Sequence, residues 1–105
     1  MSRRVVTSRR ADHDIESAVD HYLDEGAHAA ALDFVDAIDD ARSLISAHPT
    51  LGSARFAVET GIDGLRSLAL RRFPFVVLYT DDTDAVRVHR VLHTSRDLPV
   101  EFSGA

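Results

Sequence analysis

Apolar residues in the first half of the chain recur at steps of three and four, which places them on one face of a helix. The first such stripe consists of Ala11, Ile15, Ala18, Val19, Tyr22 and Leu23. Ser8 before it is a favourable N-cap, and Gly26 after it is a natural stop. A second stripe over residues 27–47 ends at His48-Pro49, because the residue before proline avoids the helical region. The short break predicts an antiparallel helix hairpin.

The second half is rich in residues typical of strands. Residues 65–72, 73–80 and 85–93 form three such segments joined by short turns, and residues 4–7 form a fourth at the start of the chain. Consecutive strands with short turns predict an antiparallel meander. The whole chain, 1–105, is therefore expected to be one α+β domain with the order β-α-α-β-β-β. Its helix hairpin packs on one face of a small antiparallel sheet.

The segment 73–80 is apolar on both faces, which is typical of a central strand covered on both sides. Only one face can be covered by the helix hairpin. The other face is expected to be covered either by a partner molecule or by the irregular segment 49–64 folding over it. In that segment Phe56 and Val58 are expected to act as anchors or to form a short extra strand.

Charge is divided unevenly along the chain. The net charge is -5, yet all 12 basic residues are arginines outside the window from Asp12 to Asp40, which holds ten acidic residues. The predicted helices are therefore acidic and the predicted sheet basic, a distribution that can orient a protein partner. The overall acidity makes direct binding of nucleic acid unexpected. The acidic residues also have a simpler interpretation as the solvated face of the helices.

Composition limits the other classes of function. The chain has no cysteine, no apolar run long enough to cross a bilayer and no signal-peptide pattern. A cytoplasmic protein that does not bind a membrane is therefore expected. It has no nucleophile elbow and no phosphate-binding glycine loop. His89 and His93 are four residues apart on a strand without a third obvious ligand, so neither a metal nor a cofactor is expected.

Several short motifs follow one another in a characteristic order. They are Tyr22, Pro49-Thr50-Leu51-Gly52, Leu65-Arg66, Phe73-Pro74-Phe75 with Tyr79, and the run from Arg90 to Asp97. Each motif is weak alone, but together they extend over nearly the whole chain. In this order and spacing the sequence resembles the RelE/ParE superfamily of toxins from bacterial type II toxin–antitoxin pairs, and its ParE branch in particular.

The resemblance implies a growth-inhibiting toxin that inhibits DNA gyrase by protein–protein binding. It also implies a cognate antitoxin whose C-terminal region wraps the toxin in a hetero-oligomer. The residues expected to form the target-binding surface are Arg66, Arg71, Arg72, Arg90, His93 and Arg96. In this interpretation the protein is not an enzyme.

RelE-like relatives instead cleave mRNA on the ribosome, and this remains an alternative. His93 would then be the general base, with Arg66, Arg90 and Arg96 stabilising phosphate charge. A third possibility is a degenerate toxin that only binds its antitoxin.

Two of these residues also have structural interpretations. Arg90 is in alternation with Val86, Val88 and Leu92, so it can be half-buried and paired with Asp97 or with a helix carboxylate. His93 can be a hydrogen-bonded structural residue at the end of a strand.

Overall fold

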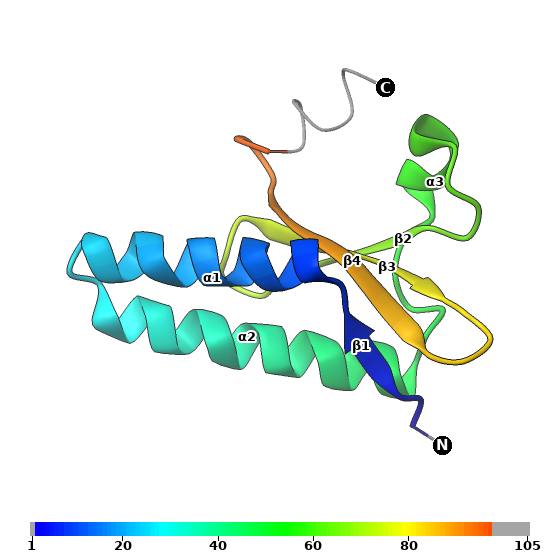
Figure 1. Ribbon diagram of the computed structural model, residues 1–105, viewed down its shortest axis with the longest axis horizontal. Helices are drawn as coiled ribbons and strands as arrows, with labels where there is room; N and C mark the ends of the chain where they lie inside the picture. Colours follow the sequence, from blue (N-terminus) through cyan, green and yellow to red (C-terminus); the bar gives the residue numbers. More distant parts are fainter. Residues whose placement is uncertain (1, 98–105) are drawn as a thin grey trace.

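The computed structural model describes residues 2–97, in which a helix hairpin packs against a four-stranded sheet (Figure 1). In chain order its elements are β1 (Val5–Thr7), α1 (Arg9–Asp24), α2 (His28–Ala47), α3 (Arg55–Thr60), β2 (Arg66–Ala69), β3 (Phe75–Asp81) and β4 (Val86–His93). The expected α+β class and the order of the predicted elements are confirmed. The addition is α3, a short helix in the segment where the sequence suggested loop anchors or an extra strand.

The sheet has the strand order β1-β4-β3-β2. Strands β2, β3 and β4 form the antiparallel meander expected from their short connections. The first strand runs parallel to the last, with Val5 opposite Val86, so the sheet is mixed rather than wholly antiparallel. Parallel neighbours require a long crossover connection, and all the intervening elements provide one here.

The helix hairpin begins and turns where the sequence predicted. The Ser8 hydroxyl oxygen accepts a hydrogen bond from the Ala11 N–H at 3.0 Å, which caps α1. Gly26 adopts a φ of 74°, a left-handed conformation that suits glycine between two helices. Figure 1 shows α1 and α2 lying side by side across one face of the sheet.

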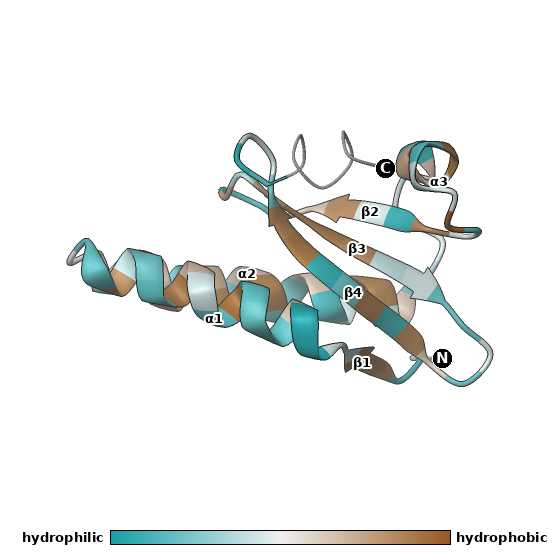
Figure 2. Cartoon of the chain, turned by 45° about the horizontal axis from the view of Figure 1, so that its top comes forward, coloured by the Kyte–Doolittle hydropathy of each residue, from teal (hydrophilic) through white to brown (hydrophobic). Residues whose placement is uncertain are grey.

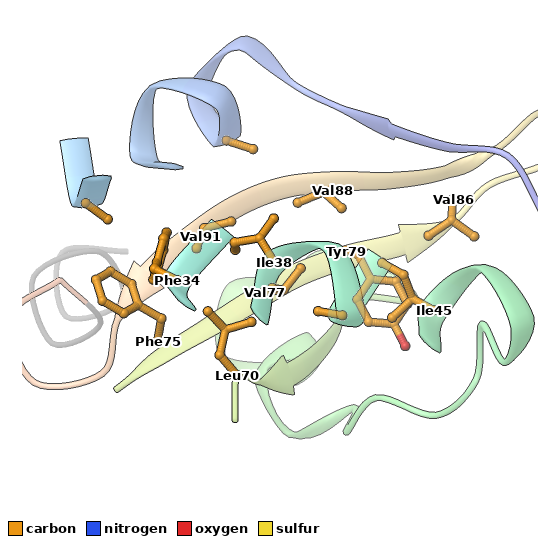
Figure 3. Packing of buried hydrophobic residues seen from close by; sticks show 13 residues of the cluster. Phe34, Ile38, Ile45, Leu70, Phe75, Val77, Tyr79, Val86, Val88 and Val91 are labelled. Atoms are coloured by element: carbon orange, nitrogen blue, oxygen red, sulfur yellow. The ribbon is translucent and has the colours of Figure 1, made fainter. Parts of the chain in front are cut away.

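The main core lies between the hairpin and the sheet (Figure 3). Phe34 of α2 is fully buried at its centre, and its ring centroid lies 5.0 Å from that of Phe75 and 5.4 Å from that of Phe73. Tyr22 of α1 joins the same group, with its ring 5.9 Å from Phe34. These edge-to-face and tilted contacts join both helices to the start of β3.

Part of the segment 49–64 packs on the opposite face of the sheet, as one of the two covers considered above predicted. Phe56 of α3 packs with Leu65, Val76, Leu78 and Leu92 in a second, smaller core. Figure 2 shows α3 beside β2, on the side of the sheet away from the hairpin. The expectation for the other anchor was wrong: Val58 is 90% exposed, because α3 turns it away from the sheet.

A bulge in β4 changes which of its residues face the helices. Leu78 pairs with Arg90 and Tyr79 with Val88, so His89 is an extra residue on β4. Before the bulge Val86 and Val88 face the hairpin, and beyond it Val91 does so. The predicted alternation that placed Arg90 and Leu92 with the two valines was therefore wrong. An extra residue exchanges the two faces of a strand.

Candidate functional surface

Tyr79 joins several of the sequence motifs in one hydrogen-bonded cluster. Its fully buried hydroxyl donates to the Pro49 carbonyl at 2.8 Å and accepts from the Gly52 N–H at 2.9 Å. Arg66 donates from Nη1 to the carbonyls of Gly52, at 2.9 Å, and Thr50, at 3.1 Å. Burial raises the pKa of Tyr79 above its ordinary value of 10.0, so the hydroxyl keeps its proton. The cluster fixes the loop between α2 and α3 to the sheet.

This cluster gives Arg66 a structural role. One of its nitrogens is occupied by two loop carbonyls, and the residue pairs with Tyr79 at the end of β3. His93 pairs with Phe75 at the other end of β3. The structure therefore separates Arg66 from His93 instead of placing them in one site, and a functional role for Arg66 stays a prediction.

Arg90 forms a two-pronged ion pair with Asp14 of α1. Its Nε lies 2.8 Å from Asp14 Oδ2, and a second bond of 3.1 Å joins Nη2 to Oδ1. Both side chains are largely buried, with exposures of 18% and 13%. Of the two partners expected for Arg90, the helix carboxylate is the one found. A bidentate pair in this environment holds α1 firmly on β4.

Where β4 continues past the end of β1, side chains bond the backbone groups on its free edge. Ser8 donates its hydroxyl to the His89 carbonyl at 2.8 Å. Asp14 Oδ2 accepts from the Val91 N–H at 3.0 Å, and Asp97 Oδ2 accepts from the His93 N–H at 2.8 Å. These bonds satisfy backbone groups that β1 is too short to reach, and they prevent another strand from pairing there.

The turn that follows β4 fixes the tautomer of the neutral His93 ring. Its Nδ1 faces two backbone donors, the Ser95 N–H at 3.2 Å and the Arg96 N–H at 3.1 Å. Nδ1 is therefore an acceptor, and the neutral ring carries its proton on Nε2. Burial, with the positive charge of Arg96 next, lowers the pKa of His93 below its ordinary value. The ring packs edge-on against Phe75, with 5.1 Å between centroids.

This arrangement predicts a dependence of stability on pH. The folded pKa lies below the ordinary value of 6.5, so the unfolded chain binds the proton more tightly. The stabilisation is complete above the ordinary pKa and is lost as the pH falls through it towards the folded value. His93→Gln should therefore flatten the decline in urea midpoint between about pH 8 and about pH 5. His13→Gln, at an exposed position on α1, is the control. An unchanged slope in the His93 variant would contradict the assignment.

The remaining candidate residues gather at one end of the sheet. Arg71 and Arg72 lie in the turn between β2 and β3, and Arg96 lies in the turn after β4. The two turns are joined by the Thr94 N–H, which donates to the Pro74 carbonyl at 2.8 Å. We call the four exposed or half-buried residues Arg71, Arg72, His93 and Arg96 the turn surface. Within residues 2–97, no carboxylate forms an ion pair with its three arginines.

Two depressions flank this region. One, of about 340 Å³, lies between α1 and the end of β4 and includes the Asp14–Arg90 pair with His13, His21 and Arg96 on its walls. The other, of about 210 Å³, is a groove between α2 and β2. Its floor is apolar, with Ala37, Ala41, Leu44, Leu68, Leu70 and Phe73. Asp33, Asp36 and Asp40 line its helix side, and Arg71 and Arg72 its turn side.

Metal ligands do not gather on the described residues. Across 2–97, no group of three or more histidine and acidic side chains is placed to hold a metal ion. A search of the same residues for a helix with the length and apolarity of a membrane span also finds none.

The sequence did not predict the contacts of Asp14 or the hydrogen bonds of the Tyr79 hydroxyl. Asp14 was grouped with the solvated helix carboxylates, although its position one turn into a helix that starts at the sheet could have indicated contact with a strand. Tyr79 was assigned to the core without a partner for its hydroxyl. The spacing of Pro49 and Gly52 contains no signal that this hydroxyl bonds both residues.

Comparison with known proteins agrees with this geometry. Residues 5–98 match the family described as the ParE toxin of the type II toxin–antitoxin system parDE. Among solved structures, the chain is similar to one titled the chromosomal ParDE TA system from P. aeruginosa. The TM-score is 0.73 with 21% identity, over 90% of this chain and 98% of that chain. No curated protein matches the sequence. The family match covers most of the chain, which therefore belongs to the ParE toxin family of type II toxin–antitoxin systems.

Proposed function

We propose that this ParE-family chain acts in the cytoplasm by binding DNA gyrase through protein–protein contact, and that a cognate antitoxin holds it inactive. Membership of the family supports the toxin role, and the similar structure is titled as a toxin–antitoxin system. The turn surface supports binding, because it presents arginines that have no partner carboxylate in the described chain. Exposed arginine is enriched at protein interfaces.

The hydrogen bonds of His93 are the main observation that favours protein binding over RNA cleavage. A neutral imidazole accepts a proton only at the nitrogen that lacks one, which here is Nδ1. That atom already accepts from the Ser95 and Arg96 amides. Of the three arginines predicted beside it as phosphate ligands, Arg66 bonds loop carbonyls and Arg90 pairs with Asp14, whereas Arg96 has no ion pair within the described residues. These contacts support protein binding over a RelE-like nuclease.

Exposed apolar side chains on the helix hairpin support the antitoxin part of the proposal. Leu32 is 70% exposed, and Leu23, Val35 and Leu44 are each about 40% exposed. Leu23 lies on α1 and the other three lie on α2. Large apolar side chains that are exposed on the surface of a small domain are typical of a contact surface. An antitoxin segment that folds along the hairpin would remove them from water.

The test is growth arrest combined with an assay of the target. The chain is expressed with and without the gene beside it, and purified protein is added to gyrase in a supercoiling assay. The proposal expects arrest that the neighbour relieves, and loss of supercoiling. Arrest with intact supercoiling and cleaved mRNA on translating ribosomes would support the nuclease instead. No arrest would indicate a relative that only binds its antitoxin.

Removing the arginines of the turn surface should weaken gyrase inhibition. Arg71→Ala with Arg72→Asn is expected to raise the concentration needed for half-inhibition about tenfold, because interface arginines often contribute strongly to binding. Asparagine is chosen because Arg72 has a φ of 69°, which asparagine tolerates. Arg9→Ala with Arg10→Ala, at exposed positions on α1, is the matched control. If both double variants lost gyrase inhibition equally, the loss would come from the change in overall charge and not from the turn surface.

A further inference from the structure

The depression of about 340 Å³ between α1 and the end of β4 is lined by polar and charged side chains, and we call it the α1–β4 depression. Three of its residues lie on successive turns of α1 and are exposed: His13, Ser17 and His21. Residues four apart share one face of a helix, so these side chains form one wall. The turn after β4 provides a second wall with Arg96 and Asp97.

The two carboxylates in the α1–β4 depression are already bonded. Asp14 Oδ2 accepts from Arg90 Nε at 2.8 Å and from the Val91 N–H at 3.0 Å, and Asp14 Oδ1 accepts from Arg90 Nη2 at 3.1 Å. The charges of Asp14 and Arg90 therefore cancel within the pair. Asp97 Oδ2 accepts from the His93 N–H at 2.8 Å. Both carboxylates thus serve the fold.

The hydrogen-bond donors on the two walls are less fully used. Within residues 2–97, the Arg96 guanidinium has no ion pair, and the side chains of His13 and Ser17 form no hydrogen bond. His21 differs, because its Nε2 lies 3.3 Å from Glu25 Oε1. A negatively charged group that accepts several hydrogen bonds would match the three unused donors.

The neighbouring charges favour a single carboxylate over a polyanion. Exposed carboxylates precede each of the three wall residues of α1, at Asp12, Glu16 and Asp20. They would repel the successive phosphates of a nucleic acid, whose binding depends on neutralising many charges. One aspartate or glutamate side chain carries a single charge, and a guanidinium binds it with two parallel hydrogen bonds.

We infer that the α1–β4 depression receives an aspartate or glutamate side chain of the target protein, with Arg96 as its ion-pair partner and His13 and Ser17 as hydrogen-bond donors. The inference rests on the proposed function, because it assumes that this chain binds a protein target. Arg96 belongs both to the depression and to the turn surface, so a target that contacts the turn surface also reaches the depression. This continuity favours the target over a second copy of the chain.

A carboxylate built into the chain tests the site without the target. Ser17→Glu places a carboxylate on the wall of the depression, whereas Ser43→Glu makes the same change at an exposed position of α2. Ser17→Glu should raise the urea midpoint by about 0.3 M relative to Ser43→Glu, because it gains Arg96 as a partner. The difference should disappear when Arg96→Gln is added to both variants. A difference that Arg96→Gln leaves unchanged would contradict the role of Arg96.

Binding to purified gyrase tests the occupant. Arg96→Gln should raise the dissociation constant about tenfold, and Arg96→Lys less, because lysine keeps the charge but loses the two parallel hydrogen bonds. Ser17→Glu should weaken binding by a similar factor, because its carboxylate takes the place of the target's carboxylate. Arg42→Gln and Ser43→Glu, at exposed positions on α2, are the matched controls and should change the dissociation constant less than about twofold.

The outcomes separate this inference from the proposed function. If the wild-type chain binds no gyrase, the proposed function fails, and the inferred occupant fails with it. If gyrase binds the Arg96 and Ser17 variants as tightly as the wild type, the function stands and the inference is overturned. Duplex DNA that binds the free chain and is displaced by Ser17→Glu would overturn it as well, since the occupant would be a phosphate. Self-association that Ser17→Glu abolishes would identify a second copy as the occupant instead.

Discussion

Replacing Gly52 with alanine should lower the free energy of unfolding by about 3 kcal/mol, because the added methyl would enter the Tyr79 cluster. An ideal Cβ at this position would lie 2.7 Å from the Tyr79 hydroxyl oxygen and 2.9 Å from the Ser67 carbonyl oxygen. Both neighbours are held by the sheet, so neither can move aside easily. Urea unfolding followed by circular dichroism measures the change.

The control is Gly26→Ala, where the strain has a different origin. Gly26 has a positive φ, but an added Cβ meets nothing within 4 Å. Gly26→Ala should lower the free energy of unfolding by only about 1 kcal/mol, because the strain comes from the backbone conformation alone. Adding Tyr79→Phe to Gly52→Ala should recover part of the loss, because it removes the closest clashing atom. If Gly52→Ala lost no more than the control, the cluster would not constrain the loop as described.

Replacing Asp14 with alanine should lower the free energy of unfolding by about 2–3 kcal/mol. The change leaves the largely buried Arg90 guanidinium without its carboxylate, and it leaves the Val91 N–H without an acceptor. Thermal and urea unfolding measure the loss. Glu16→Ala, at an exposed position on the same helix, should change stability by less than about 0.5 kcal/mol.

Two further variants separate the contributions of Asp14. Asp14→Asn keeps an oxygen for the Val91 N–H but removes the charge, so it should be milder than alanine. Asp14→Ala with Arg90→Met removes both charges and should recover part of the loss. The interpretation would be wrong if the double variant were as unstable as the sum of the two single ones.

The helices were predictable because their periodicity and their termini agree. The Ser8 cap, the Gly26 turn and the proline at position 49 all lie where the structure requires them. The meander was predictable for a similar reason, since short turns leave adjacent strands few alternatives. The family match then confirmed what the order of the motifs had indicated.

The parts that could not be predicted depend on contacts between distant residues. The bulge at His89 reversed the alternation of β4, and no local pattern marks it. The partner of Arg90 is 76 residues away in the chain, at Asp14. For the candidate site, the chain pattern identified basic residues but not which of them were already bonded. Only the fold distinguishes Arg66, with its two loop carbonyls, from Arg71 and Arg72 in the exposed turn.

The parallel pairing of β1 with β4 also affects how the domain forms during synthesis. The ribosome makes Val5 long before its partner Val86, and the intervening chain must be complete before the two can meet. Until then the hairpin helices have no sheet on which to bury their apolar faces. Contacts this distant slow folding, because loop closure comes before any gain from pairing. The nascent chain thus passes through a period without a finished sheet, in which the apolar faces of both helices are still open to water.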